Sequence, residues 1–210
     1  MRLEPITWER LSDALADRLL DLKPADGGAW PRVAFDGAPA AGTGDLARAV
    51  ADALRLRGRD SLVVSTEGFL RPASLRFEYG HQDVEAYYSG WFDTGALWRE
   101  VIGPLDPGGT GRILPDLWDP VADRATRSPY ARLPPGGALL LHGPLLLGHW
   151  FPFDLTVHVR LSPGALRRRT PEADRWTLPA FERYEDEVDP SAVADVVVRA
   201  DDPRHPAWSG

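Results

Sequence analysis

The sequence predicts an α/β protein: a three-layer sandwich with a mainly parallel, five-stranded sheet and helices on both faces. Short apolar runs recur along the chain, helical patterns separate most of them, and a glycine-rich turn joins the first run to a helix. Strands that alternate with helices favour a parallel sheet, which needs cover on both faces. The 210 residues, 43% of them hydrophobic, fit a single domain with one sizeable core.

The first predicted element is a helix within residues 1–30. Thr7 is a suitable N-cap, and apolar residues recur at helical spacing from Trp8 to Leu20, before Pro24 ends the pattern. Residues 32–35 then form a short apolar run that predicts a buried strand. We therefore expect a surface helix followed by a central strand.

The glycine-rich turn after that strand has the outline of a phosphate-binding loop. In the pattern G-x-x-x-x-G-K-[ST], backbone N–H groups surround the phosphates, Lys reaches them and the hydroxyl binds Mg²⁺. Gly37, Ala41 and Gly42 keep the turn, but Thr43 stands at the Lys position and Gly44 at the Ser/Thr position. The sequence predicts the shape of the loop without its charged and metal-binding side chains.

Residues 61–65 predict a second strand, so the opening order implies a parallel pair with a right-handed crossover. The segment that follows is rich in aromatic residues, and a helix is expected over residues 93–101. These aromatic side chains could form a pocket for a flat ligand or close the side of a small core. Both alternatives stay open at this stage.

The rest of the chain predicts further strands and helices. Residues 112–118 and 124–128 could pair as a hairpin, and residues 201–210 are expected to form a loose tail. The remaining predictions are strands at 138–141, 154–161 and 195–199, and helices at 163–169 and 178–188 within a lid and helix region, 163–190.

Composition excludes several functions. The net charge of −7 argues against a sequence-independent nucleic-acid grip, and the absence of cysteine excludes disulfides and thiolate chemistry. No apolar run approaches the length of a membrane span, so we expect a cytoplasmic protein without membrane contact. The histidines lack metal-binding spacing, so no metal site is predicted, and His158 is interpreted as a packing or sheet-face residue of its strand.

Four stretches together resemble the uridine/cytidine kinase-like branch of P-loop nucleoside kinases, close to the phosphoribulokinase relatives. They are the glycine-rich turn, residues 64–72 with Glu67-Gly68-Phe69, residues 87–97 with Trp118-Asp119, and residues 138–143 followed by 154–169. The resemblance covers about residues 32–198. It implies a P-loop kinase fold and a small-molecule ligand, a nucleoside or nucleotide.

The resemblance also assigns roles to single positions. The acid that takes the proton from the ribose 5′-hydroxyl falls on Glu67, and the acid that helps order Mg²⁺ falls on His142, a poor ligand for a hard cation. Substrate-side positions fall on Arg71, Tyr87, Tyr88, Trp91, Trp118 and Asp119, and lid arginines on Arg167, Arg168, Arg169 and Arg175.

Asp45 follows the loop and is expected to cap the next helix, where its carboxylate would occupy the anion site. Two hypotheses follow. The first is an ATP-dependent nucleoside kinase with Glu67 as base, which would use ATP and Mg²⁺. The second, which the sequence favours, is a ligand-binding or regulatory protein that has lost phosphoryl transfer and needs no certain cofactor. The oligomeric state stays open, with a homo-oligomer among the options.

Overall fold

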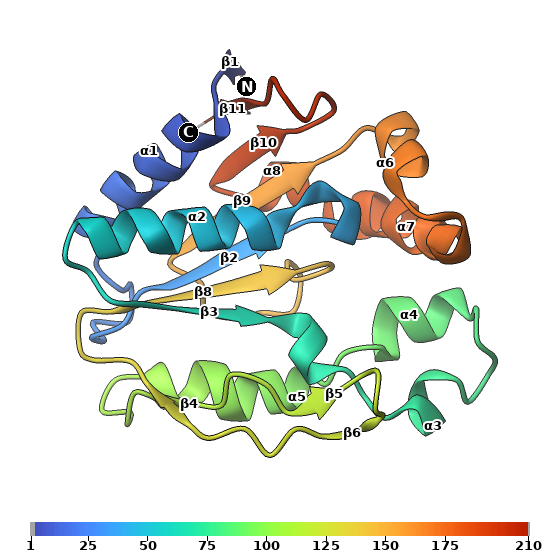
Figure 1. Cartoon of the computed structure of the whole chain (residues 1–210), viewed down its shortest axis with the longest axis horizontal. Helices are drawn as coiled ribbons and strands as arrows, with labels where there is room; N and C mark the ends of the chain where they lie inside the picture. Colours follow the sequence, from blue (N-terminus) through green and yellow to red (C-terminus); the bar gives the residue numbers. More distant parts are fainter. Residues whose placement is uncertain (1–2, 210) are drawn as a thin grey trace.

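The computed structural model describes residues 3–209, which surround a seven-stranded sheet in the order β1-β11-β10-β9-β2-β8-β3. The five neighbouring strands from β10 to β3 run parallel, as predicted, and Figure 1 shows them in this order. They are β2 (Arg32–Asp36), β3 (Ser61–Ser65), β8 (Ala138–Gly143), β9 (Leu155–Arg160) and β10 (Val196–Arg199).

The two remaining strands extend one edge of the sheet. β11 (Ala207–Ser209) pairs antiparallel with β10, and β1 (Glu4–Pro5) pairs antiparallel with β11. The expected loose tail is therefore wrong at residues 207–209. The edge of β10 offers unpaired backbone groups, and β11 satisfies them while Trp208 packs against the core.

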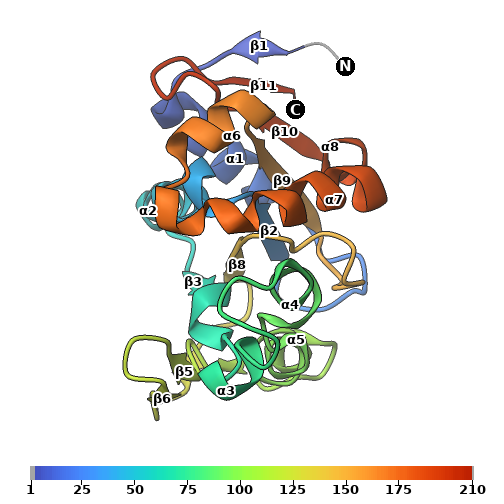
Figure 2. The ribbon, with the colours of Figure 1, turned by 90° about the vertical axis from the view of Figure 1, so that its right-hand side faces the viewer.

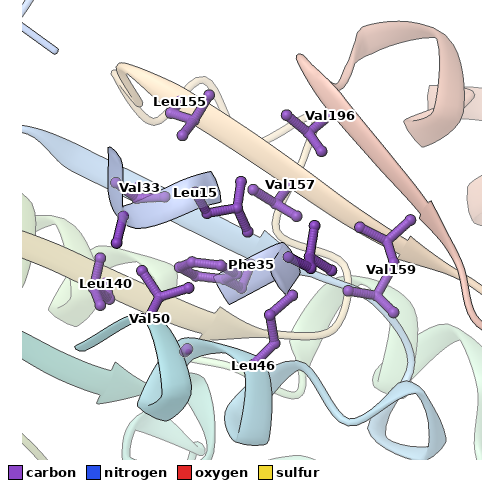
Figure 3. Close-up of a cluster of buried hydrophobic side chains, with 14 of the residues drawn as sticks. Leu15, Val33, Phe35, Leu46, Val50, Leu140, Leu155, Val157, Val159 and Val196 are labelled. Carbon is purple, nitrogen blue, oxygen red and sulfur yellow. The ribbon is translucent and has the colours of Figure 1, made fainter. Parts of the chain in front are cut away.

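Helices α1 (Trp8–Asp21) and α2 (Thr43–Leu56) cover one face of the sheet. The Thr7 hydroxyl accepts a hydrogen bond from the backbone N–H of Arg10, which confirms the predicted N-cap. Leucine side chains of α1 and α2 meet Val33 and Phe35 of β2 in a fully apolar cluster, drawn in Figure 3. Every residue of β2 is buried, as its apolar run predicts.

The opposite face is covered by α4 (Val84–Gly90), α5 (Thr94–Leu97) and α7 (Leu178–Val188). The expected helix over residues 93–101 exists as α5 followed by a π-helical turn, Trp98–Ile102. The predicted sandwich with helices on both faces is confirmed. The remaining helices are α3 (Ala73–Arg76), α6 (Pro163–Arg169) and α8 (Pro190–Val193), with 3₁₀ turns at Pro39–Ala41, Thr66–Phe69, Gly103–Leu105 and Glu172–Thr177.

Two short strand pairs lie outside the main sheet. β5 (Trp118–Asp119) pairs with β6 (Arg124–Ala125), which agrees with the expected hairpin. β4 (Arg112–Ile113) pairs instead with β7 (Ala131–Arg132), so that part of the hairpin prediction is wrong. Figures 1 and 2 both place β5 and β6 at the end of the molecule farthest from α6.

Candidate functional site

The glycine-rich turn wraps from β2 to α2 as predicted. A Cβ atom at Gly37 would lie 2.7 Å from the carbonyl oxygen of Val159, and Gly42 has a left-handed backbone with φ of 77°. Side chains are excluded at the first position by space and disfavoured at the second by strain. The Thr43 side chain, at the Lys position, is buried and turns back toward Gly37. The loop therefore has the expected path without an internal cation.

The N-terminus of α2 is open. No side chain caps it, although Asp45 is in its first turn. The Asp45 carboxylate instead accepts a hydrogen bond from the Arg48 guanidinium at 2.6 Å, and both side chains are mostly exposed. The expectation that Asp45 occupies the anion site is wrong, because Arg48, three residues further along the helix, offers an opposite charge on the same surface.

His142 lies against Gly44. A Cβ atom at Gly44 would lie 2.9 Å from Cε1 of the His142 ring and 3.2 Å from Nδ1. The imidazole therefore occupies the space into which a Ser or Thr side chain would project. Burial and then the charge of Arg48 lower the pKa of His142, so the ring is neutral at pH 7. This contact joins Gly44, which departs from the phosphate-loop pattern, to His142 of β8, which stands where the resemblance implies an acid.

Glu67 lines a small cavity that Gly44 and His142 also border. It lies in the 3₁₀ turn after β3, where its backbone N–H donates to the Ser65 hydroxyl. The cavity measures about 230 Å³, and Arg48 and His142 contribute to its wall. This volume lies below the range of typical small-molecule pockets and suits a phosphate-sized group. We call this space the Glu67 cavity.

Gly68, which follows Glu67, has a structural reason to lack a side chain. A Cβ atom there would lie 2.8 Å from Cβ of Asp116, and the Gly68 carbonyl accepts a hydrogen bond from the backbone N–H of Leu117. The hairpin region thus packs on the chain directly beside Glu67. A side chain at this position has no room.

The aromatic middle segment closes the side of the core. Tyr87 is buried and packs edge-on against Trp176 at 5.5 Å and Phe181 at 5.9 Å between ring centroids, with Trp91 at 5.4 Å. Burial, and then the charges of Glu67 and Asp174, raise the pKa of Tyr87. Of the two alternatives, the packing matches the one in which these rings complete the core.

The other substrate-side residues are dispersed. The Tyr88 hydroxyl donates to Glu187, and the Arg183 guanidinium lies over its ring. Arg71 lines a separate cavity beside α4. None of Arg71, Tyr87, Tyr88 and Trp91 lines the Glu67 cavity. Their contact with a ligand stays a prediction.

Trp118 and Asp119 stabilise their own hairpin. The Trp118 indole donates to the Asp123 carboxylate at 3.0 Å, and Asp119 accepts hydrogen bonds from the backbone N–H groups of Val121 and Ala122. These contacts turn the chain between β5 and β6. The structure does not bring this pair to the phosphate loop.

The four lid arginines do not converge. Arg169 donates to the carbonyl oxygens of Ala200 and Asp201, and it lines a cavity of about 510 Å³ beside Trp8. Arg167 and Arg175 line a different cavity, on the other side of the loop, whereas Arg168 is exposed on α6. Sequence spacing alone did not separate these positions, because successive helical residues point in different directions.

A buried ion pair beneath α7 was missed by sequence reasoning. His158 Nδ1 lies 2.7 Å from Asp36 Oδ2, and Asp36 also accepts a hydrogen bond from the backbone N–H of Leu146. Burial lowers the pKa of His158, but the hydrogen bond that Nδ1 donates to Asp36 and the nearby carboxylates of Asp36 and Glu185 outweigh it and raise the pKa to about 9. His158 is therefore charged at pH 7. The sequence signal for this ion pair was a polar residue in each of two apolar strands, Asp36 in β2 and His158 in β9.

Residues 3–209 hold neither a cluster of metal-binding side chains nor a membrane-spanning helix. Within this part of the chain no group of three or more His, Asp or Glu side chains could hold a metal ion. None of its helices combines the length and the apolar character that crossing a bilayer requires.

Solved structures similar to this one decide the fold. A protein described as a possible uridine kinase from Bacillus stearothermophilus matches with a TM-score of 0.71 and 21% identity, over 89% of this chain and 96% of that one. The chain has a uridine kinase-like P-loop fold. A proposed fructose transport system kinase from Silicibacter sp. TM1040 shares this kinase-like fold, with a TM-score of 0.56, 24% identity and coverage of 86% and 82%.

The YGR205w protein is a third structure with this uridine kinase-like fold, with a TM-score of 0.54, 10% identity and coverage of 92% and 93%. No protein-family model matches the sequence, and no curated protein matches it. The similarity therefore concerns the fold, and the chemistry must be argued from the residues.

Proposed function

We propose that this chain is a ligand-binding protein on a kinase fold that does not transfer phosphate from Mg-ATP. The observation that carries the proposal is the contact between His142 and Gly44, in which the imidazole takes the space of the hydroxyl that would bind Mg²⁺. Mg²⁺ prefers oxygen ligands in near-octahedral geometry, and a neutral imidazole is a poor substitute. The residues present do not fit a magnesium ion.

The missing lysine supports the same proposal. Phosphoryl transfer depends mainly on positioning and on stabilising the charge of the moving phosphoryl group. Thr43 supplies no charge, and the nearest cation on the cavity wall, Arg48, is paired with Asp45. The two parts of the usual catalyst nearest the phosphates, the lysine and the metal ligands, are both replaced.

The Glu67 cavity still offers backbone donors to a ligand. The open N-terminus of α2 presents N–H groups and the positive end of the helix dipole, and the charge of Arg48 at the rim is shared with Asp45. The resemblance to a uridine kinase-like protein suggests a nucleoside or nucleotide as the ligand. In this proposal the phosphate end binds without a metal ion.

An active ATP-dependent nucleoside kinase is the second candidate. One observation favours it: Glu67 faces the same cavity as the loop, where a carboxylate could take a proton from a hydroxyl group. Arg48 would then have to replace the lysine. This candidate still lacks a cation and metal ligands at the positions where the charge develops.

The test measures binding by calorimetry and phosphorylation of uridine, with ATP in the presence and absence of Mg²⁺. We expect no phosphorylation and no increase in ATP affinity with Mg²⁺. The variant Thr43→Lys/Gly44→Thr/His142→Asp should gain at least about tenfold in Mg-ATP affinity, about 1.4 kcal/mol. Thr43→Lys/Gly44→Thr is the matched control, and it should gain little because His142 still occupies the metal space.

Phosphorylation of uridine by the unchanged protein, lost in Glu67→Gln, would establish the kinase instead. An equal gain in the control and in the triple variant would show that His142 does not block the site.

A further inference from the structure

A second cavity lies on the other side of the glycine-rich turn. It measures about 610 Å³ and is enclosed by the end of β9, α6 and α7, with Gly37 and Ala38 at one border. This volume is in the range of small-molecule pockets. Neither Glu67 nor His142 lines it. We call it the β9–α7 cavity. It shares no lining residue with the Glu67 cavity.

An unsatisfied donor faces this cavity. The His158 side chain is 5% exposed, and its Nε2 atom has no hydrogen-bond partner among residues 3–209. Nδ1 is engaged by Asp36, and the nearest acid to Nε2, Glu185, is 3.8 Å away, too far for a hydrogen bond. A buried polar atom without a partner costs free energy, so a ligand atom that accepts from Nε2 would be favoured.

The gap between Nε2 and Glu185 identifies the kind of ligand atom. A hydroxyl group can accept a hydrogen bond from the imidazolium and donate one to a carboxylate. The separation of 3.8 Å between Nε2 and Glu185 Oε1 allows one oxygen to lie within hydrogen-bond distance of both. An ammonium group could not accept from Nε2, and it would be repelled by the charge of His158.

Arg160 places a positive charge beside this position. It lies two residues after His158 on β9, so both side chains are on the same face of the sheet, and its charge acts on Glu185. Arg160 lines the cavity, and its side chain makes no ion pair among residues 3–209. A carboxylate of the ligand could bind it through two parallel hydrogen bonds.

Overall charge and lining limit the ligand further. The arginines that line the cavity, Arg160, Arg167 and Arg175, are balanced by Glu182, Glu185 and Asp186. The lining is therefore close to neutral, and it does not favour a phosphate dianion. Leu178 and Phe181 of α7 supply an apolar surface for the rest of the molecule.

We propose that the β9–α7 cavity binds an α-hydroxy acid with an apolar body. Its hydroxyl group lies between His158 and Glu185, its carboxylate binds Arg160, and its apolar part packs against α7. This site is independent of the Glu67 cavity and stands whether or not the proposed function is correct.

Three probes of nearly equal shape test the proposal by calorimetry: 3-phenyllactate, 3-phenylpropionate and phenylalanine. They carry a hydroxyl, a hydrogen and an ammonium group at the same carbon atom. We expect 3-phenyllactate to bind about tenfold more tightly than 3-phenylpropionate, and phenylalanine to bind most weakly. Glu185→Ala should reduce the preference for the hydroxyl group to about twofold.

Arg160→Gln should weaken the binding of 3-phenyllactate and of 3-phenylpropionate at least about tenfold. Arg168→Gln is the matched control, because Arg168 is exposed on α6 and does not line the cavity. Arg48→Gln is the control for the Glu67 cavity. Neither control should change the affinity, and thermal unfolding checks that each variant is folded.

Four outcomes would overturn the proposal. They are equal binding of 3-phenyllactate and 3-phenylpropionate, tighter binding of phenylalanine, an equal effect of Arg168→Gln and Arg160→Gln, and loss of binding in Arg48→Gln. The last outcome would place the ligand in the Glu67 cavity.

Discussion

His142 and His158 lie toward the carboxyl ends of the two strands that flank β2. At pH 7 the His142 ring is neutral and the His158 ring is positively charged. His142 pairs in register with Phe35 and faces α2, whereas His158 pairs with Asp36 and faces α7. Burial lowers the pKa of His142, with a further contribution from Arg48. Burial also opposes the charge on His158, but two carboxylates outweigh it. Burial acts on both rings, and the carboxylates that contact His158 account for the difference between them.

The difference matters for the two cavities. On the α2 side, a neutral ring packs on a glycine and fills space that a metal site would need. On the α7 side, a charged ring is anchored through Nδ1, and its Nε2 has no hydrogen-bond partner among residues 3–209. In the two proposals above, one histidine takes the space of a metal ligand and the other donates to a bound ligand.

The largest expected effect comes from breaking the buried pair. His158→Phe should lower the free energy of unfolding by about 3–5 kcal/mol, because Asp36 would stay buried without its partner. Urea denaturation measures it. His205→Phe is the control, since the His205–Asp202 pair is exposed and should contribute less than about 1 kcal/mol. A loss below about 1 kcal/mol in His158→Phe would show that Asp36 is solvated in another way.

A somewhat smaller effect is expected from pH. The pKa of His158 is raised from 6.5 to about 9, so the folded protein holds a proton that the unfolded chain releases. This stabilisation is complete below about pH 6.5 and is lost as the pH rises through about 9. The free energy of unfolding should fall on the order of 2 kcal/mol between about pH 7 and about pH 9.5. His158→Gln should flatten that curve, and an unchanged slope in the variant would contradict the assignment.

The smallest expected effect concerns the other histidine. Gly44→Thr should cost about 1 kcal/mol of unfolding free energy, because the His142 ring must move away from the new side chain. In the His142→Ala background the same substitution should cost little. A double-mutant cycle measures this coupling, and additive effects would mean that the ring and Gly44 do not constrain each other.

The scaffold was predictable because its signals are local. Apolar runs of strand length, helical spacing and the pair Gly37 and Gly42 each act within a few residues. Glu67 was assigned by the resemblance and not by these local signals, and the structure places it in the cavity that borders the loop. The contact of Gly44 with His142 was not predictable in this way, since it joins segments far apart in the chain.

The misassigned residues have related causes. Asp45 was expected to cap α2, but Arg48, one turn further along the helix, donates a hydrogen bond to its carboxylate. His158 was interpreted as a packing or sheet-face residue. Its ion pair was missed because its partner, Asp36, belongs to another strand. The residue type of Tyr87 is compatible with a ligand pocket and with a core. Its contacts with Trp176 and Phe181 distinguish these two alternatives. Side-chain chemistry at this site depends on pairs that the chain order does not show.

The strand pair β1 and β11 has a consequence for the order of folding. Glu4 pairs with Trp208, so this edge of the sheet closes a loop of almost the whole described chain. Closing a long loop costs entropy before its contacts can repay it, and non-local pairs form slowly. Within the sheet, β1 pairs with no described strand except β11, which must first pair with β10. We expect the terminal strands to be the last to join the sheet and the first to leave it.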